Sequence, residues 1–230
     1  MRIEDDKRIF KKKTYFIVPF LMEERYGETE FEVYRGIKKT VQAFERDYKG
    51  RYFTRDALKY ISSALDPYLE ENGYERDTYG TTRFYYSYEM KDKAELDSSI
   101  VLPGTHRLTE EIVKTHKNPT TFDLKYILDV GLWAYVTLEN GEVAAIATVN
   151  ETLEEGSMPE VTVETAVNYR GKGYAGSCVA ALCGALLDAG HKVAYCCRNT
   201  HSQSNRIAKR VGFRRIGRFY AVSAYRKTRE

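Results

Sequence analysis

The chain has 230 residues, of which 43% are hydrophobic and 30% charged, a balance typical of a folded globular protein rather than a disordered or fibrous one. The N-terminal stretch MRIEDDKRIFKKK is highly charged, and the first apolar run, 15–22, is far shorter than the roughly 20 residues of a membrane span. The sequence therefore predicts no signal peptide, no membrane span and a cytoplasmic location.

The net charge of +3 conceals a strong asymmetry along the chain. Residues 168–230 contain 13 Lys or Arg and two acidic residues, whereas residues 1–167 contain 23 basic and 31 acidic residues, a net charge of −8. A solvated basic face is one interpretation. The steepness of the segregation favours a phosphate-rich ligand for the C-terminal part, and it is also compatible with nucleic acid.

The four cysteines, Cys178, Cys183, Cys196 and Cys197, show no C-x-x-C spacing and no histidine pair at metal-ligand intervals. We expect reduced, mostly buried thiols and no metal site. Cys196 and Cys197 end an apolar strand and are interpreted as small apolar filling, because no base is visibly placed beside them to make either a nucleophile.

The first 97 residues predict helices and a strand without catalytic spacing. One helix is expected at 36–48, and a second follows a Thr54 N-cap and is kinked or stopped by Pro67. The aromatic stretch 82–90 predicts a strand, and its tyrosines are interpreted first as packing residues. The polar segment 91–99 is interpreted as a linker.

A helical segment is expected at 107–116, and after it the spacing of apolar residues changes from that of helices to that of strands. Apolar strands at 132–138 and 143–149 flank Asn140-Gly141, a strong hairpin signal. The pattern then predicts a strand at 160–167, a glycine-rich loop, a helix at 175–189, a strand at 192–197 and a helix at 204–210 that ends at Gly212, followed by a last strand.

The loop sequence YRGKGYAG admits three phosphate-binding interpretations. A Walker A loop is excluded because Lys172 lies between the first two glycines. The dinucleotide fingerprint G-x-G-x-x-G matches Gly171, Gly173 and Gly176, but no acidic residue lies between Asp188 and Glu230 to hold a ribose. The third pattern is R-x-x-G-x-A, carried by Arg170, Gly173 and Ala175.

The physical chemistry of this loop suits a pyrophosphate. Glycines let the main chain approach the anion closely, and the N–H groups of residues 171–176 converge on it at the start of a helix, where the helix dipole favours negative charge. Arg170 and Lys172 add formal positive charge.

The tract VTVETAVNYRGKGYAGSCVAALCGALLDAG, together with SNRIAKRVGF, resembles the GNAT superfamily of acyl-CoA N-acyltransferases, whose loop has the form [QR]-x-x-G-x-[GA] and whose closing helix ends in [KR]-[VLI]-G-[FY]. The resemblance covers about residues 99–226. Within the superfamily, the loop YRGKGYA followed by SNRIAKRVGF, in a chain with a long N-terminal extension, is similar to a bacterial branch of largely uncharacterised acetyltransferases. The resemblance implies a mixed α/β (α+β) fold, with a central, mostly antiparallel sheet of splayed strands flanked by helices. The domains expected are an N-terminal α+β region, 1–97, and a GNAT-like domain, 98–230.

The resemblance implies acetyl-CoA as acyl donor and direct attack by an amine, without a covalent enzyme intermediate. Main-chain groups of Val163 and Thr165 would follow the pantetheine arm, with the Thr165 N–H donating to the thioester oxygen. The residues expected to bind the coenzyme are Val163, Glu164, Thr165, Arg170, Gly171, Lys172, Gly173, Tyr174, Ala175, Gly176, His201 and Asn205. The arginines Arg206, Arg210 and Arg214 are candidates for the adenosine 3′-phosphate.

Catalytic assignments follow less directly. Glu160 and Glu164 are the candidate general bases for the amine. The family's usual tyrosine acid is replaced by Ala208, and its usual asparagine by His201, flanked by Asn199 and Asn205. Tyr220 or Tyr195 could serve as the acid, thiolate departure could need no acid, or the chain could bind a coenzyme without turnover.

Two functions stay open. The first is an N-acetyltransferase that acts on a primary amine of a small molecule or a peptide, with a cationic acceptor favoured by the acidic first part of the chain. The second is a non-catalytic module that binds a coenzyme-A derivative or nucleic acid. For the enzyme we expect no membrane or nucleic-acid partner, and a homodimer stays open. The N-terminal region either supplies an acceptor wall or packs as a separate module.

Overall fold

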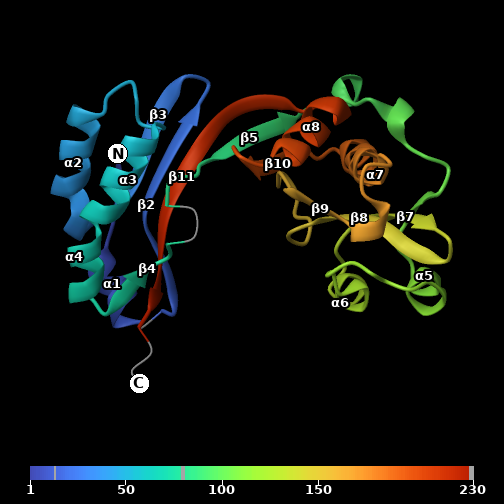
Figure 1. The fold of residues 1–230 in the computed structure, drawn as a ribbon, viewed down its shortest axis with the longest axis horizontal. Coiled ribbons are helices and arrows are strands. Elements are labelled where there is room, and N and C mark those ends of the chain that lie inside the picture. The colour runs from blue at the N-terminus through green and yellow to red at the C-terminus, as the bar shows by residue number, and fades with distance from the viewer. Residues whose placement is uncertain (13, 79–80, 228–230) are drawn as a thin grey trace. The chain divides into compact units, whose positions relative to one another are not determined.

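The computed structural model describes residues 1–12, 14–78 and 81–227, and the chain divides into two compact units (Figure 1). The first unit comprises Met1–Tyr86, Arg198–Thr200 and the residues from Ile216 on; the second comprises Ser87–Cys197 and His201–Arg215. Strands β5 (Tyr85–Met90), β10 (Val193–Arg198) and β11 (Arg214–Arg226) have residues in both units. The expected domains, 1–97 and 98–230, stay a prediction.

The first unit is a sheet covered on one face by helices (Figure 1). Its strands follow the order β1-β3-β2-β11, and β4 also pairs with β11. Phe20, Phe44 and Leu58 are completely buried between the sheet and the helices. Its remaining elements are β1 (Arg2–Glu4), α1 (Asp6–Lys11), β2 (Phe16–Arg25), β3 (Glu28–Tyr34), the 3-10 turn η1 (Arg35–Ile37), α2 (Lys38–Asp47), α3 (Arg55–Ala64), α4 (Asp66–Glu71) and β4 (Tyr74–Arg76).

Helices α2, α3 and α4 form within the two helical segments that the sequence predicts, whereas α1 was not predicted. The Thr54 hydroxyl accepts a hydrogen bond from the Ala57 N–H at 3.3 Å and so caps α3, because the first N–H groups of a helix have no partner within it. Pro67 lies in the first turn of the separate helix α4, where a missing N–H costs nothing. The predicted strand at 82–90 forms from Tyr85 on.

The second unit contains a sheet in the order β6-β7-β8-β9, with helices on both faces (Figure 1). Helix α7 packs on one face, and α5 and α6 enclose the other with Val136, Val143 and Ile146. Its remaining elements are η2 (Lys93–Glu95), η3 (Ser98–Ile100), β6 (Thr105–Arg107), α5 (Glu110–Thr115), α6 (Leu124–Asp129), β7 (Ala134–Glu139), β8 (Glu142–Val149), β9 (Val161–Thr165), η4 (Val167–Tyr169), α7 (Tyr174–Asp188) and α8 (Ser202–Val211).

The predicted hairpin and the strand–loop–helix order are confirmed in this unit. Asn140 and Gly141 have φ of 53° and 75°, the left-handed pair that a two-residue hairpin turn requires. Helix α8 ends at Gly212, whose φ of 113° lies in the left-handed region that glycine tolerates. The mixed α/β fold expected from the sequence is therefore the observed fold.

The interpretation of residues 91–99 as a linker is wrong. This segment packs closely on the end of α8. The Asp97 N–H donates to the Val211 carbonyl at 2.9 Å. The Glu95 carbonyl oxygen is so near Gly212 that a Cβ added to this glycine would lie only 1.8 Å from it. Lys93 also pairs with Asp188 at the end of α7. Polar composition alone does not distinguish a linker from an ordered segment that is held by main-chain hydrogen bonds.

Candidate functional site

Strands β9 and β10 touch at one point and then separate. An isolated parallel bridge joins Glu160 to Ala194, supported by a 2.9 Å hydrogen bond from the Ala194 N–H to the Pro159 carbonyl. Beyond it, β9 is the edge of one sheet and β10 belongs to the other. The splay between these strands, expected from the resemblance, is therefore present.

The separation leaves one edge of β9 open. The Ala166 N–H donates to the Ala144 carbonyl at 3.0 Å. The main-chain groups of residues 162, 164 and 166 therefore face β8. Main-chain groups alternate sides along an antiparallel strand, so those of Val163 and Thr165 face the other edge. That edge has no ladder partner among the described residues.

The open edge leads into the glycine loop. Gly171 and Gly173 have φ of 82° and 89°, which a residue with a Cβ adopts only with strain. Gly173 is the N-cap of α7, and no side chain caps this helix start within the part of the chain that is described. The first hydrogen bond of α7 runs from Ser177 to Gly173 at 3.1 Å, so the preceding N–H groups, those of Tyr174, Ala175 and Gly176, emerge from the helix start. This is an anion-binding geometry.

Basic side chains approach this loop in three different ways. Arg210 of α8 brings a guanidinium nitrogen within 4.0 Å of the position that a Cβ on Gly173 would take. The Lys172 ammonium lies 5.4 Å and 5.8 Å from the ring centroids of Tyr169 and Tyr174. The Arg170 Nε donates to the Thr165 carbonyl at 3.5 Å. Among the three arginines expected to meet the 3′-phosphate, Arg210 is the one for which a position beside the glycine loop is observed in the described residues.

The Glu164 side chain contacts Thr121, in the loop before α6, on the face of the sheet that α5 and α6 cover. Its carboxylate accepts from the Thr121 N–H at 3.1 Å and 3.2 Å and from the Thr121 hydroxyl at 2.6 Å. Its partner across the strands is Ile146, part of the core beneath α5 and α6. Glu164 therefore holds the segment before α6 against β9, a contact between residues 43 positions apart that no local pattern signals.

Glu160 lies where the strands part and is half-buried. Burial raises the pKa of Glu160, the charge of Glu151 adds to the rise, and a hydrogen bond from the Cys196 thiol opposes it. A carboxyl group whose pKa is raised by burial is suited to accepting a proton near neutral pH.

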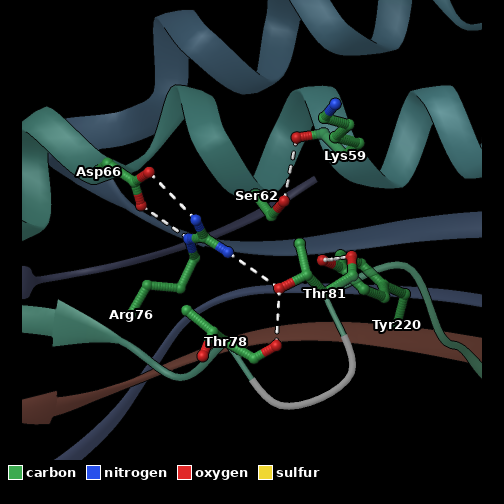
Figure 2. A network of polar contacts seen from close by, with 7 residues as sticks. All are labelled: Lys59, Ser62, Asp66, Arg76, Thr78, Thr81 and Tyr220. Atoms are coloured by element: carbon green, nitrogen blue, oxygen red, sulfur yellow. Dashed lines mark hydrogen bonds and ion pairs between the residues drawn. The ribbon is translucent and has the colours of Figure 1, made fainter.

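Tyr220 lies in the core of the first unit (Figure 2). Its hydroxyl donates to the Thr81 carbonyl at 2.8 Å, its ring is 2% exposed, and burial raises the pKa of Tyr220 to about 12. The same segment is held by Arg76, which donates to the Thr81 hydroxyl at 3.0 Å and pairs with Asp66 at 2.7 Å and 3.1 Å. The Tyr220 hydroxyl thus has a structural partner, and its assignment as an acid stays a prediction.

His201 and Asn205 are brought together at the start of α8. The Asn205 side chain accepts from the Tyr88 hydroxyl at 2.7 Å and donates to the His201 carbonyl at 2.9 Å, and His201 Nδ1 lies 3.2 Å from the Ser204 hydroxyl. Ala208 is completely buried one turn after Ser204.

Tyr195 of β10 lies beneath the same helix. It is 2% exposed, and burial raises the pKa of its hydroxyl to about 12. Its assignment as an acid stays a prediction.

All four cysteines are free; Cys178, Cys183 and Cys197 are buried and Cys196 is half-buried. Within the described residues, no group of three or more His, Cys, Asp and Glu side chains has an arrangement that could hold a metal. Among the described helices, none is both long and apolar enough to cross a membrane.

Comparison with known proteins bears directly on the strand–loop–helix arrangement. Residues 130–222 match the GNAT acetyltransferase family, and this range contains the open edge, the glycine loop and α8. Residues 130–222 belong to the GNAT acetyltransferase family. A search of curated proteins found no match.

One solved structure shares the fold of the chain. A putative GNAT-family acetyltransferase from Novosphingobium aromaticivorans is 18% identical, with 68% of this chain and 69% of that chain covered and a TM-score of 0.50. A GCN5-related N-acetyltransferase-like protein from Streptococcus suis is 19% identical, with 73% and 68% covered and a TM-score of 0.45. The first of these likenesses places the chain among GNAT folds, as the motifs predicted.

Proposed function

We propose that this chain is an acetyl-CoA-dependent N-acetyltransferase, which transfers the acyl group to a primary amine of a small molecule or a peptide by direct attack. One observation carries the proposal: the open edge of β9 runs directly into an uncapped helix start with two left-handed glycines. An extended amide chain that ends in a pyrophosphate matches this sequence of features, and coenzyme A is such a molecule.

The edge and the loop would bind different parts of the donor. The main-chain groups of Val163 and Thr165 would pair with the pantetheine amides as an added strand does. The N–H groups from Gly171 to Gly176 would hold the pyrophosphate, with Arg210 adding a charge-assisted contact. Arg170 bonds to the Thr165 carbonyl at the same edge, so it would exchange this contact for one with the donor.

Glu160 is the base that the geometry favours. The amine nitrogen would attack the thioester carbon, the C–S bond would break, and Glu160 would take the proton that the nitrogen loses. The Thr165 N–H would donate to the carbonyl oxygen as it becomes negative. Glu164 is less suited to the role, because its carboxylate oxygens already accept three contacts from Thr121.

Departure of the thiolate would need no dedicated acid. A free thiol has a pKa of about 8.5, so leaving as the anion at pH 7 costs only about 2 kcal/mol more than leaving protonated. This accounts for Ala208 at the position where the family commonly has a tyrosine.

The acceptor is proposed to be cationic. The first 167 residues carry the net charge of −8, and the first unit has a cavity of about 410 Å³ lined by Glu23, Glu30 and Glu32 together with Arg2. Charge of this sign attracts ammonium groups over several ångströms in solvent. A cytoplasmic location and the assembly state remain predictions.

A second candidate function follows from the buried Ala208. A chain without the usual acid could bind a coenzyme-A derivative, or nucleic acid, without turnover. Titration calorimetry with acetyl-CoA, and with duplex DNA at two salt concentrations, distinguishes these cases, because phosphate-backbone binding weakens steeply with salt.

The proposal is tested by following thiol release from acetyl-CoA over a panel of cationic, neutral and acidic amines. We expect release that depends on amine, with cationic acceptors preferred. Acetyl-CoA binding without release from any amine supports the binding module, and preference for acidic amines contradicts the cationic acceptor.

A further inference from the structure

A row of hydrogen bonds joins the first turn of α7 to the strands on which this helix packs. The Ser177 hydroxyl accepts from the Leu102 N–H at 2.8 Å and lies 2.6 Å from the Thr105 hydroxyl. The Thr105 hydroxyl lies 2.7 Å from that of Thr137, which in turn lies 3.1 Å from the Cys178 sulfur. Ser177, Thr137 and Cys178 are buried, so most of this row is shielded from solvent.

The strand register brings the two threonine hydroxyls of the row together. Thr105 of β6 lies directly opposite Thr137 of β7, so their side chains share one face of the sheet. The neighbouring Val136 belongs to the core beneath α5 and α6, and successive residues of a strand point to opposite faces. Thr105 and Thr137 are therefore on the face that α7 covers, and the row crosses from the sheet to the helix.

The hydrogen bonds of the row run in one direction. The Cys178 thiol donates its single hydrogen to the Ala145 carbonyl at 3.5 Å, so its sulfur accepts from the Thr137 hydroxyl. Thr137 therefore accepts from Thr105, and Thr105 accepts from Ser177. Each hydroxyl both donates and accepts between a main-chain N–H at one end and a main-chain carbonyl at the other. Removal of one hydroxyl leaves a donor and an acceptor without partners, which is costly where they are buried.

The turn that receives this row also carries the N–H groups of the candidate anion site. The Ser177 N–H donates at 3.1 Å to the carbonyl of Gly173, the residue that begins α7. Beside it, the Ile100 Cδ1 atom lies 3.7 Å from the position that a Cβ on Gly176 would take. Ser177 is therefore tied through its main chain to the helix start and through its hydroxyl to β6.

We propose that Thr105 is a positioning residue for the anion site, because it holds the first turn of α7 through Ser177 and so directs the N–H groups of residues 174–176 at the pyrophosphate of the donor. This role rests on the proposed function. Hydrogen bonds to an anion weaken when the N–H group points away from it, so the direction of these groups affects the affinity for the donor. Thr105 lies outside residues 130–222, the range that matches the GNAT acetyltransferase family.

The first experiment compares variants that lose or keep the hydroxyl at position 105. Valine has nearly the shape of threonine without the hydroxyl, whereas serine keeps the hydroxyl and loses a methyl group. We expect KM for acetyl-CoA to rise about threefold to tenfold in Thr105→Val, with kcat within about twofold of the wild type. Thr105→Ser should restore KM to nearly the wild-type value. Ser177→Ala removes the next hydroxyl of the row and should raise KM as Thr105→Val does.

Thr148→Val is the matched control for the loss of a buried hydroxyl. Thr148 is buried in β8, and its hydroxyl donates to the Trp133 carbonyl at 3.0 Å. It lies two residues from Ile146, which belongs to the core beneath α5 and α6, so its side chain is on the face of the sheet away from α7. We expect Thr148→Val to lose stability while KM for acetyl-CoA stays at the wild-type value.

The second experiment requires neither the donor nor activity. Hydrogen exchange followed by mass spectrometry measures how often main-chain hydrogen bonds open, including those of the Leu102 and Ser177 N–H groups. In Thr105→Val, peptides that contain residues 102 and 174–178 should exchange severalfold faster than in the wild type. Peptides from residues 182–188, in the second half of α7, should keep the wild-type rate, since they report the stability of the helix as a whole. Thr148→Val should leave residues 102 and 174–178 unchanged relative to residues 182–188.

The outcomes separate this inference from the proposed function. In an active enzyme, an unchanged KM in Thr105→Val overturns the positioning role, and so does an equal rise in Thr148→Val or a rise that Thr105→Ser does not reverse. Unchanged exchange at residues 102 and 174–178 in Thr105→Val overturns it as well. A wild type that neither binds acetyl-CoA nor releases thiol overturns the proposed function instead, and faster exchange confined to those residues then still supports the hold of Thr105 on the first turn of α7.

Discussion

Arg210 on α8 brings its guanidinium within 4.0 Å of the Cβ position of Gly173, the residue that begins α7. Helices α7 and α8 would therefore both contribute to the proposed anion site, α7 with its N-terminal N–H groups and α8 with a formal charge. Because Gly173 has no Cβ, it adopts a φ of 89° without strain, and no side chain at this position blocks an approaching anion.

Arg210→Ala should weaken donor binding selectively. A charge-assisted hydrogen bond contributes about 1.5–3 kcal/mol, so KM for acetyl-CoA should rise about tenfold to a hundredfold while kcat changes little. Steady-state kinetics at two salt concentrations measure this. Lys209→Ala, at the neighbouring exposed position, is the matched control. An equal rise in KM in both variants would mean that Arg210 acts only through the general field of the helix.

Glu160→Gln should lower kcat by about a hundredfold to ten-thousandfold, the range for loss of a general base. In the wild type the base must be ionised, so activity should fall as the pH drops through the raised pKa of Glu160. Glu164→Gln should retain most of its activity, since Glu164 holds Thr121. A larger loss in Glu164→Gln than in Glu160→Gln would reverse the assignment.

The stability of Glu160→Gln provides an independent check. A carboxyl whose pKa is raised on folding makes the folded state less stable once the pH exceeds the unfolded pKa, because burial penalises the ionised form. The variant should therefore have a Tm equal to or above that of the wild type at pH 7, and this gain should vanish at acidic pH. A lower Tm at pH 7 would indicate that the ionised carboxylate is structural.

Tyr220→Phe tests a role suggested by the sequence. The Tyr220 hydroxyl donates to the Thr81 carbonyl within the first unit, so its loss should reduce the free energy of unfolding by about 1–3 kcal/mol and leave kcat within a few-fold. Urea titration and kinetics on the same sample give both values. A collapse in kcat at unchanged stability would instead establish Tyr220 as the acid.

Local patterns predicted the parts of this molecule that depend on neighbouring residues. Asn140-Gly141 predicted the hairpin, and the R-x-x-G-x-A pattern that begins at Arg170 predicted the loop. Both depend on backbone conformations that a few adjacent residues determine. The partners of the candidate catalytic groups were not predictable in this way. Glu164 meets Thr121 and Tyr220 meets Thr81 across 43 and 139 positions, and only the packed fold brings such residues together.

Gly212→Ala should destabilise the chain well beyond an ordinary glycine substitution. An added Cβ would lie 1.8 Å from the Glu95 carbonyl oxygen, and the φ of 113° is unfavourable for alanine. We expect a loss of more than about 3 kcal/mol, against about 1–2 kcal/mol for Gly50→Ala, which has a positive φ but open space around it. Equal losses would mean that residues 91–99 detach readily from α8.

The most direct test of the account is the affinity for acetyl-CoA, measured by titration calorimetry in the wild type, Gly173→Glu and Gly190→Glu. Both glycines have similar left-handed φ values, 89° and 86°, but Gly190 follows the C-terminal end of α7, so it controls for backbone strain. We expect Gly173→Glu to abolish binding, because its carboxylate would stand where the pyrophosphate belongs, while Gly190→Glu binds like the wild type. Wild-type affinity in Gly173→Glu would contradict the assignment of the loop to the donor.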